Sequence, residues 1–329
     1  MKRCQLLSVL AALAVIAAIL SLAIGRVPLA PTRVLAALAG GSDETARIIV
    51  VQLRLPRGIL GLAVGAVLGL AGAALQGYLR NPLAEPSVLG ASNGAALGAV
   101  VALYFGLAAL HPIALPALAV AGALLALLLL VLLAGRDASA LSLILAGVAV
   151  GTVAGAGIAL ALNLSPNPFA AMEIMTWLMG SLEDRSMEHV ALALPCIAAG
   201  LVLLAGQARA LDALTLGEDA ARSMGVDLAR LRRRLLVGTA VGVGGAVAVS
   251  GAIGFVGLIV PHLLRPLTDR SPSAVLWPSA LGGAALLTFA DVAVRLVPTT
   301  SELRLGVVTS LLGVPVFLLL LRREWGAWS

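Results

Sequence analysis

Residues 209–234, RALDALTLGEDAARSMGVDLARLRRR, form a polar segment in an otherwise apolar sequence. Ten of its side chains are charged. The segments on both sides are apolar and of membrane-spanning length, for which about 20 residues suffice. A run this polar is excluded from the hydrocarbon core, so the segment, here named the polar island, lies in water between two spans.

The polar island predicts two short helices separated by a turn. Thr215 followed by Glu218 matches a capping box, which opens a helix by satisfying its first backbone N–H groups. Gly225 predicts the end of that helix, because glycine tolerates the left-handed conformation past a helix end. Asp227 is placed to cap the next helix. Such a unit at a membrane surface is suited to being gripped by another protein.

The composition predicts an all-α polytopic membrane protein that forms a single domain over residues 1–329. The chain is 60% hydrophobic, with a mean hydropathy of +1.07, which exceeds what a soluble domain needs. The net charge of +6 is also found in nucleic-acid-binding proteins. Here the basic residues fall in interhelical loops, so they indicate membrane topology and no nucleic-acid partner.

The scarcity of lysine and cysteine excludes several kinds of site. Lys2 is the only lysine, so the chain holds neither a G-x-x-x-x-G-K-[ST] phosphate loop nor a buried Schiff-base lysine. Any ATP must be hydrolysed by another chain. Cys4 and Cys196 have no metal-binding spacing. We therefore expect no catalytic residue, no metal site and no cofactor in this chain.

Hydropathy predicts about ten membrane spans. A signal peptide is the alternative for the first span, but this apolar run is longer than the apolar region of a typical signal peptide, and many spans follow. The loop at 25–55 is expected to carry a short helix at 32–38, and the segment at 165–188 is expected to carry a short helix near 176–179. The predicted spans are 6–24, 58–78, 88–106, 113–134, 141–163, 190–206, 235–250, the shorter 251–264, 274–296 and 305–321.

The basic residues predict the orientation. With the N-terminus in the cytoplasm, most of the 22 Lys and Arg residues, including those of the polar island, lie on the cytoplasmic side. This satisfies the positive-inside rule, and the reverse orientation inverts the bias. We expect a multi-pass membrane protein, in contact with lipid, with both termini cytoplasmic; that the membrane is the bacterial inner membrane is implied only by the family resemblance given below.

Thirteen of the 36 glycines, together with Ala and Ser residues, recur at every fourth position along four predicted spans. Small residues on one stripe let helix backbones approach closely, which favours a tightly packed bundle over a role in lining a substrate path. The stripes are Gly61, Gly65, Gly69, Ala73, Gly77; Gly90, Gly94, Gly98, Ala102, Gly106; Gly147, Gly151, Gly155; and Gly238, Gly242, Ala246, Ser250.

Four stretches together resemble the FecCD-type permeases. These are the membrane subunits of binding-protein-dependent ABC importers for ferric siderophores, haem and cobalamin. The resemblance runs from about residue 53 to the C-terminus. The stretches are QGYLRNPLAEPSVLGASNGA, LTLGEDAARSMGVD in the polar island, SGAIGFVGLIVPHLLR and ELRLGVVTSLLGVPVFLLLL.

This resemblance implies a homodimer of type II ABC importer architecture, with ten helices per subunit and the path between the subunits. Two ATPase subunits, which bind ATP and Mg²⁺, attach below, and a periplasmic binding protein docks above. Residues 209–234 correspond to the coupling helices that contact the ATPase.

The resemblance also implies roles for individual residues. A cytoplasmic gate corresponds to Asn81, Pro82 and Leu83. A second gate element falls in loop 136–140, which matches poorly and supplies no residue. The residues that match the ATPase-coupling pattern are Leu214, Gly217, Glu218, Ala221, Arg222 and Gly225.

Arginines predicted on the outer side run against the charge bias. Arg54, Arg57 and Arg295 match family positions that dock the binding protein, whereas each alone is also consistent with snorkelling at a headgroup. Exposed ion pairs contribute about 0.2–1 kcal/mol each, so such a ring steers and orients the partner more than it binds it.

Asp291 is the acid that lies well inside a predicted span. An intramembrane carboxylate is a functional candidate, but Arg295 follows four residues later, the spacing of an intrahelical pair. We favour the Asp291–Arg295 pair over proton coupling. His111, His189 and His262 have no metal-binding spacing.

The predicted function is a permease subunit that imports an iron chelate, siderophore or haem, driven by a partner's ATP hydrolysis. A cobalamin importer of the same family is the alternative. A secondary transporter predicts several ionisable residues at the midplane and two matching halves, and a membrane enzyme predicts an interfacial His, Asp or Glu cluster. The sequence favours neither.

Overall fold

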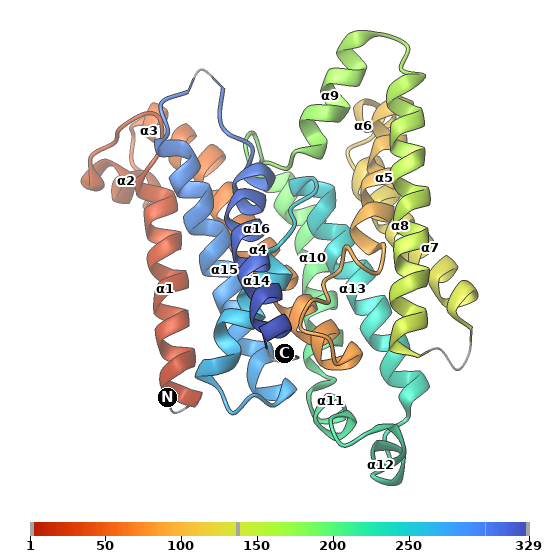
Figure 1. Cartoon of the computed structure of the whole chain (residues 1–329). Helices are drawn as coiled ribbons and strands as arrows, with labels where there is room; N and C mark the ends of the chain where they lie inside the picture. The colour runs from red at the N-terminus through yellow and green to blue at the C-terminus, as the bar shows by residue number, and fades with distance from the viewer. Residues whose placement is uncertain (1–2, 136–138, 300, 327–329) are drawn as a thin grey trace.

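The computed structural model describes residues 3–135, 139–299 and 301–326, and within these it is helical without strands (Figure 1). The elements are α1 (Arg3–Ala23), α2 (Pro31–Leu38), α3 (Glu44–Arg47), η1 (Ile48–Arg54), α4 (Leu55–Leu79), α5 (Ala91–Tyr104), α6 (Leu107–Leu110), α7 (Ala114–Ala134), α8 (Ala140–Asn163), α9 (Pro168–Leu178), α10 (Met187–Ala205), α11 (Ala208–Leu214), α12 (Glu218–Ser223), α13 (Leu228–Ser250), α14 (Val256–Leu264), η2 (Arg265–Leu267), α15 (Pro272–Leu296) and α16 (Leu305–Gly326).

In the described residues, 7 helices are long and apolar enough to cross a membrane. Three shorter apolar helices, Ala91–Tyr104, Val256–Leu267 and Leu305–Leu318, accompany them. Each predicted span falls on one of these helices, and the short ones include the predicted short segment at 251–264. The number of ten membrane crossings stays a prediction.

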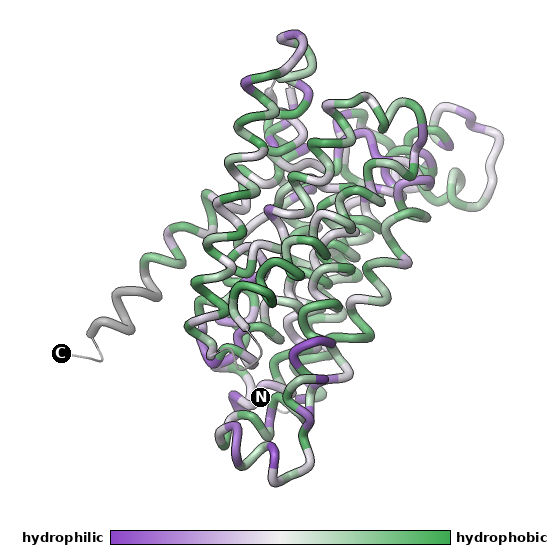
Figure 2. Tube along the Cα trace, turned by 90° about the vertical axis from the view of Figure 1, so that its right-hand side faces the viewer, coloured by the Kyte–Doolittle hydropathy of each residue, from purple (hydrophilic) through white to green (hydrophobic). Residues whose placement is uncertain are grey.

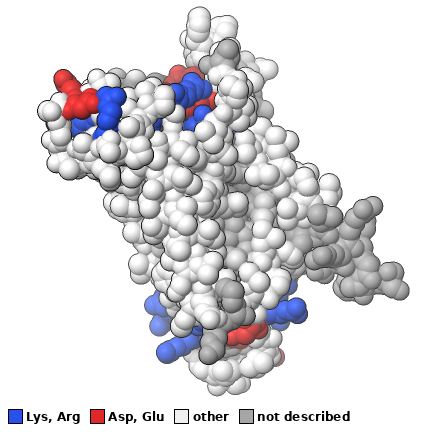
Figure 3. Space-filling view, turned by 90° about the vertical axis from the view of Figure 1, so that its left-hand side faces the viewer, with Lys and Arg blue, Asp and Glu red and all other residues white. Residues whose placement is uncertain are grey.

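Charged side chains gather at the two ends of the molecule, with an uncharged band between them on the face that Figure 3 shows. The trace in Figure 2 is hydrophobic along the middle of most helices and hydrophilic towards the ends. The start of α1 lies at the same end as α11 and α12 (Figure 1). This agrees with a shared side for the N-terminus and the polar island. Which side faces the cytoplasm stays a prediction.

Residues 44–54, expected within a loop, are helical. α3 and the π-helix η1 run directly into α4, so that Glu44–Leu79 is one helical stretch of 36 residues. Pro56 lies inside this stretch, next to the point where the π-helix η1 passes into α4 and the hydrogen-bond ladder changes its pattern. Asp43 begins the stretch by accepting a hydrogen bond from the Ala46 amide at 3.0 Å.

Two further elements differ in length from their predictions. The span expected at 235–250 is the second part of α13, which begins at Leu228 and so carries arginines of the polar island. The short helix expected at 176–179 is the end of α9, which Asn167 caps. Both helices begin at polar residues, which the apolar pattern alone does not include.

The glycine stripes bring helix backbones together, as predicted. A Cβ added to Gly65 of α4 would lie 2.2 Å from the carbonyl oxygen of Gly283 on α15, and the reverse addition gives the same distance. Gly98 of α5 meets the carbonyl of Leu118 on α7 at 2.0 Å in the same way. Nothing lies within 4 Å at Gly155, so this stripe position serves no contact within the described part of the subunit.

Candidate functional site

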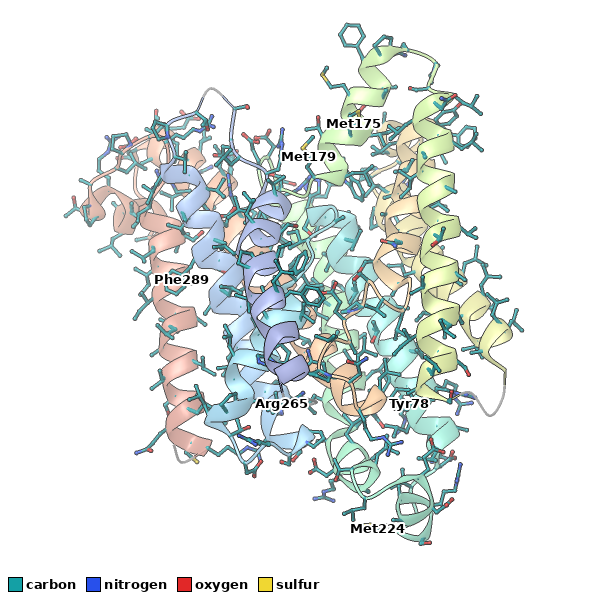
Figure 4. The ribbon with its side chains drawn as sticks, in the orientation of Figure 1. Tyr78, Met175, Met179, Met224, Arg265 and Phe289 are labelled. Atoms are coloured by element: carbon teal, nitrogen blue, oxygen red, sulfur yellow. The ribbon has the colours of Figure 1, made fainter. Side chains whose placement is uncertain are left out.

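The polar island projects from one end of the bundle as α11 and α12 (Figure 1). Leu214 and Ala221 are buried and hold the island together. Leu216 and Met224 flank α12 and are 67% and 63% exposed, and Met224 lies at the outer tip (Figure 4). These two large apolar side chains are available for a contact with another protein.

The turns of the island differ from prediction in one cap. The Thr215–Glu218 capping box is wrong, because Thr215 Oγ1 donates instead to the Asp212 carbonyl at 2.7 Å and α12 begins after Gly217. Gly217 has φ +103°, a conformation that favours glycine. Gly225, at φ +83°, ends α12 as expected.

Asp227 caps α13, as predicted. Its Oδ1 accepts a hydrogen bond from the Arg230 amide at 2.9 Å. The same bond lowers the pKa of the Asp227 carboxyl. The cap fixes the start of the helix that joins the island to the bundle.

Glu218 and Arg222 form an ion pair on the island, with Arg222 Nη2 3.1 Å from Glu218 Oε2. Both side chains are about half exposed. They line a cavity of about 600 Å³ between the island and the ends of α4, α8 and α13. Tyr78 of α4 and Arg232 of α13 line the same cavity. The residues predicted to couple with an ATPase thus lie together on the island, and their role stays a prediction.

The predicted gate residues form a tight turn after α4. Arg80 ends that helix at φ +49°, and Asn81 Oδ1 then accepts a hydrogen bond from the Leu83 amide at 2.9 Å. Asn81, Pro82 and Leu83 are all partly buried. We refer to residues 81–83 as the gate turn. In loop 136–140, expected to hold the second gate element, positions 136–138 lie outside the described residues.

At the opposite end of the bundle, Arg54 is 5% exposed. Its Nη1 donates to the carbonyls of Leu22 and Ala23, both at 2.8 Å. These carbonyls end α1 and have no partner within the helix. Arg54 is therefore a C-terminal cap for α1 supplied by η1.

Asp291 joins two arginines of the same end. The predicted pair with Arg295 is confirmed, since Arg295 Nε lies 3.1 Å from Asp291 Oδ2. Arg57 of α4 donates to Asp291 as well, with Nη2 2.8 Å from Oδ1, and reaches Glu302 Oε2 at 2.7 Å. Arg295 also donates to the Ser21 carbonyl at 2.8 Å. We name these residues the outer charge cluster; it ties α1, α4 and α15 together.

The sequence interpretation took Arg54, Arg57 and Arg295 as side chains available to a partner, and this part is wrong. They are 5%, 9% and 7% exposed and occupied within the subunit. Spacing along the chain does not show this, because Arg57 and Asp291 are 234 positions apart. Arg26, by contrast, has a side chain 46% exposed and lies 3.5 Å from Glu302.

No group of three or more His, Cys, Asp or Glu residues arranged to hold a metal occurs in the described part of the chain. The His189 ring instead takes part in a capping box with Ser186 at the start of α10.

Comparison with known proteins identifies one protein family. The FecCD transport family matches residues 13–323. The vitamin B12 import system permease BtuC of Salmonella schwarzengrund is 41% identical over 316 residues, 96% of this chain and 94% of that protein. An uncharacterized ABC transporter permease, YvrB of Bacillus subtilis, is 41% identical over 290 residues, 87% of this chain and 82% of that protein. The cobalamin import permease of Halobacterium salinarum is 42% identical over 289 residues, 87% and 77% of the two chains.

Two solved structures have a similar fold. A metal-chelate type ABC transporter in an inward-facing conformation superimposes with a TM-score of 0.85 at 31% identity, covering 98% of this chain and 99% of that one. PsaBC from Streptococcus pneumoniae shares the fold at a TM-score of 0.55 and 18% identity, over 88% of this chain and 94% of that one. The chain therefore belongs to the FecCD transport family and is a multi-span membrane permease of an ABC importer.

Proposed function

We propose that this chain forms the transmembrane path of an importer that carries a bulky metal chelate from the periplasm to the cytoplasm across the bacterial inner membrane. The observation that carries this proposal is its likeness, over nearly the whole chain, to permeases of that class. ATP is hydrolysed by two copies of a partner ATPase, and a periplasmic binding protein delivers the cargo. Two copies of the chain enclose the path.

We propose two candidate classes of cargo. An iron chelate, siderophore or haem, is the first candidate and follows from the family resemblance. Cobalamin is the second, and the names of two relatives favour it. All of these are large chelates in which the metal is already held by its chelator, so the path needs no side chains that hold the metal.

In the proposed cycle the polar island is the part of the permease that the ATPase moves, and the gate turn closes the cytoplasmic end of the path (the inner seal). ATP-driven closure of the ATPases moves α11 and α12, and the two subunits alternate their access to the two sides. The exposed Leu216 and Met224 support this contact. At the other end, the burial of Arg54, Arg57 and Arg295 supports an indirect role in docking, in which they fix the surface that the binding protein meets.

The test is an uptake assay in a bacterial host that lacks its own chelate importers. The chain is produced together with a candidate ATPase and a candidate binding protein from the same genome. We expect ATP-dependent accumulation of one among radiolabelled cyanocobalamin, a ferric hydroxamate siderophore and haem. A matched strain carries an ATPase that binds but does not hydrolyse ATP, and we expect no accumulation there. Accumulation of none of the three, or equal uptake in the matched strain, would contradict the proposal.

A further inference from the structure

We propose that Glu85 is a positioning residue, which holds the gate turn against the start of α14. This rests on the proposed function only in that the gate turn is taken as the inner seal. Glu85 is partly buried and lies just past residues 81–83, in the segment that joins α4 to α5. The sequence motifs described above give it no role.

The Glu85 carboxylate binds at the N-terminus of α14. It accepts hydrogen bonds from the backbone N–H of Phe255 and from the Ser87 hydroxyl. Phe255 is the N-cap residue of α14 and has no side-chain oxygen with which to cap it. A negative charge is favourable at a helix N-terminus, where unpaired N–H groups and the helix dipole present positive charge. The carboxylate thus supplies from another segment what Phe255 lacks.

Phe255 is itself held in a conformation that few bulky residues adopt. Its φ of +66° and ψ of −20° are left-handed, at a cost of roughly 1–3 kcal/mol that surrounding contacts must offset. One such contact is with α16, because a Cβ added to Gly313 would lie 2.4 Å from the Phe255 ring. The other is the bond to Glu85. The turn is therefore fixed by two elements, α16 and the segment that carries the gate turn.

The segment 84–90 is also fixed on its other side. Gly147 of α8 packs so closely on it that an added Cβ would lie 2.3 Å from the Val88 carbonyl. Pro86 contacts α14 near Gly257, at 3.3 Å from a Cβ built there. Within segment 84–90, Glu85 is the charged residue, and it also hydrogen-bonds to the start of α14. It therefore sets the position of the segment along α14.

The far end of α14 leads back to the polar island. Arg265 Nη2 donates to Gln76 Oε1 at 2.9 Å, and Gln76 in turn reaches the Leu258 carbonyl of α14 at 3.3 Å. Figure 4 places Arg265 low in the bundle, on the side of the island. The amide of Ser273, in the first turn of α15, donates to Asp212 of α11 at 2.8 Å, so the island is bonded to α15, which follows α14 and η2 along the chain. A shift of the island can thus move α14, and Glu85 transmits that shift to the gate turn.

The experiment measures how often the gate turn opens, without cargo. The full chain carries Cys4→Ser, Cys196→Ser and Leu83→Cys, and the purified subunit in detergent reacts with a maleimide. We expect Glu85→Ala to raise the labelling rate about tenfold, because losing a hydrogen bond to a charged acceptor shifts a local opening equilibrium by about that factor. Glu85→Gln keeps a neutral acceptor, and we expect a rise of about threefold or less.

Two controls keep the result specific. Ser87→Ala removes the hydroxyl partner but leaves the bond to Phe255, and we expect it to change the rate less than about twofold. A second reporter, Leu216→Cys on the exposed island, should label at the parent rate in every variant. An unchanged labelling rate at position 83 in Glu85→Ala would overturn the proposal. So would an equal rise at both reporters, which indicates general loosening, or a Ser87→Ala effect as large as that of Glu85→Ala. The labelling experiment uses no cargo, so its outcome does not depend on the outcome of the uptake assay. A failure of this proposal can therefore be distinguished from a failure of the proposed function.

Discussion

Asp291 is the residue on which the outer charge cluster depends. It is 1% exposed and accepts hydrogen bonds from Arg57 and Arg295. Without the charge of Asp291, the buried guanidinium group of Arg57 would keep one carboxylate partner, Glu302. The buried guanidinium group of Arg295 would lose its carboxylate partner. Breaking a buried ion pair by removing one partner is costly because it leaves the other charge uncompensated. This geometry supports a structural role for Asp291 over proton coupling.

We predict that Asp291→Asn destabilises the subunit by about 3 kcal/mol or more, the range measured for broken buried pairs. The thermal unfolding midpoint of the purified subunit checks this. Arg33→Gln is the matched control: it removes the exposed pair with Asp43, which is worth about 1 kcal/mol at most. An Asp291→Asn subunit as stable as the parent, with altered pH dependence of transport, would instead favour proton coupling.

At the scale of elements, α4 and α15 pack closely along much of their length. Gly65 and Gly283 face each other across it, and the outer charge cluster joins the same two helices at one end through Arg57 and Asp291. Close backbone approach supplies the packing that lipid-exposed hydrophobic contact does not. The pair is thus held by packing along its length and by charge at its end.

We predict that Gly65→Ala lowers the stability of the subunit by about 1–3 kcal/mol, since the added methyl group must push α15 away. Gly155→Ala is the control at the same helical spacing, where nothing lies within 4 Å. Alanine there is expected to be neutral or stabilising by up to about 1 kcal/mol. Equal thermal midpoints for the two variants would show that the stripe on α4 does not set the helix spacing.

Hydropathy and periodicity predicted the helices well because both signals are local. The stop at Gly225 and the cap at Asp227 were predicted from short-range chemistry and are confirmed. The helix over 44–54 was missed because its polar residues resemble a loop. The partners of Arg57 were missed because they are brought together only by the packing of α4 on α15. Thr215 shows the limit of a short motif, since its hydroxyl closes one helix rather than opening the next.

At the scale of the whole molecule, Figure 3 shows charged side chains at the two ends of the subunit and an uncharged band between them. The island end presents exposed apolar side chains on a short rigid unit, whereas the opposite end presents Arg26 above a cluster of internally paired charges. An apolar contact rimmed by charge suits a stable partner, and an exposed charge suits a transient one. This difference fits a resident ATPase at one end and a cycling binding protein at the other.

The island contact can be tested by its two exposed apolar residues. We predict that Leu216→Ser with Met224→Ser reduces co-purification of the partner ATPase at least about tenfold, because central apolar anchors carry most of the energy of an interface. Leu110→Ser is the control, since Leu110 is 79% exposed on α6 at the other end of the molecule (Figure 1). The double variant should keep the parent's thermal midpoint, because neither side chain packs in the subunit core. ATPase retained by the double variant and lost by Leu110→Ser would place the contact at the wrong end and reverse the proposed orientation of the permease.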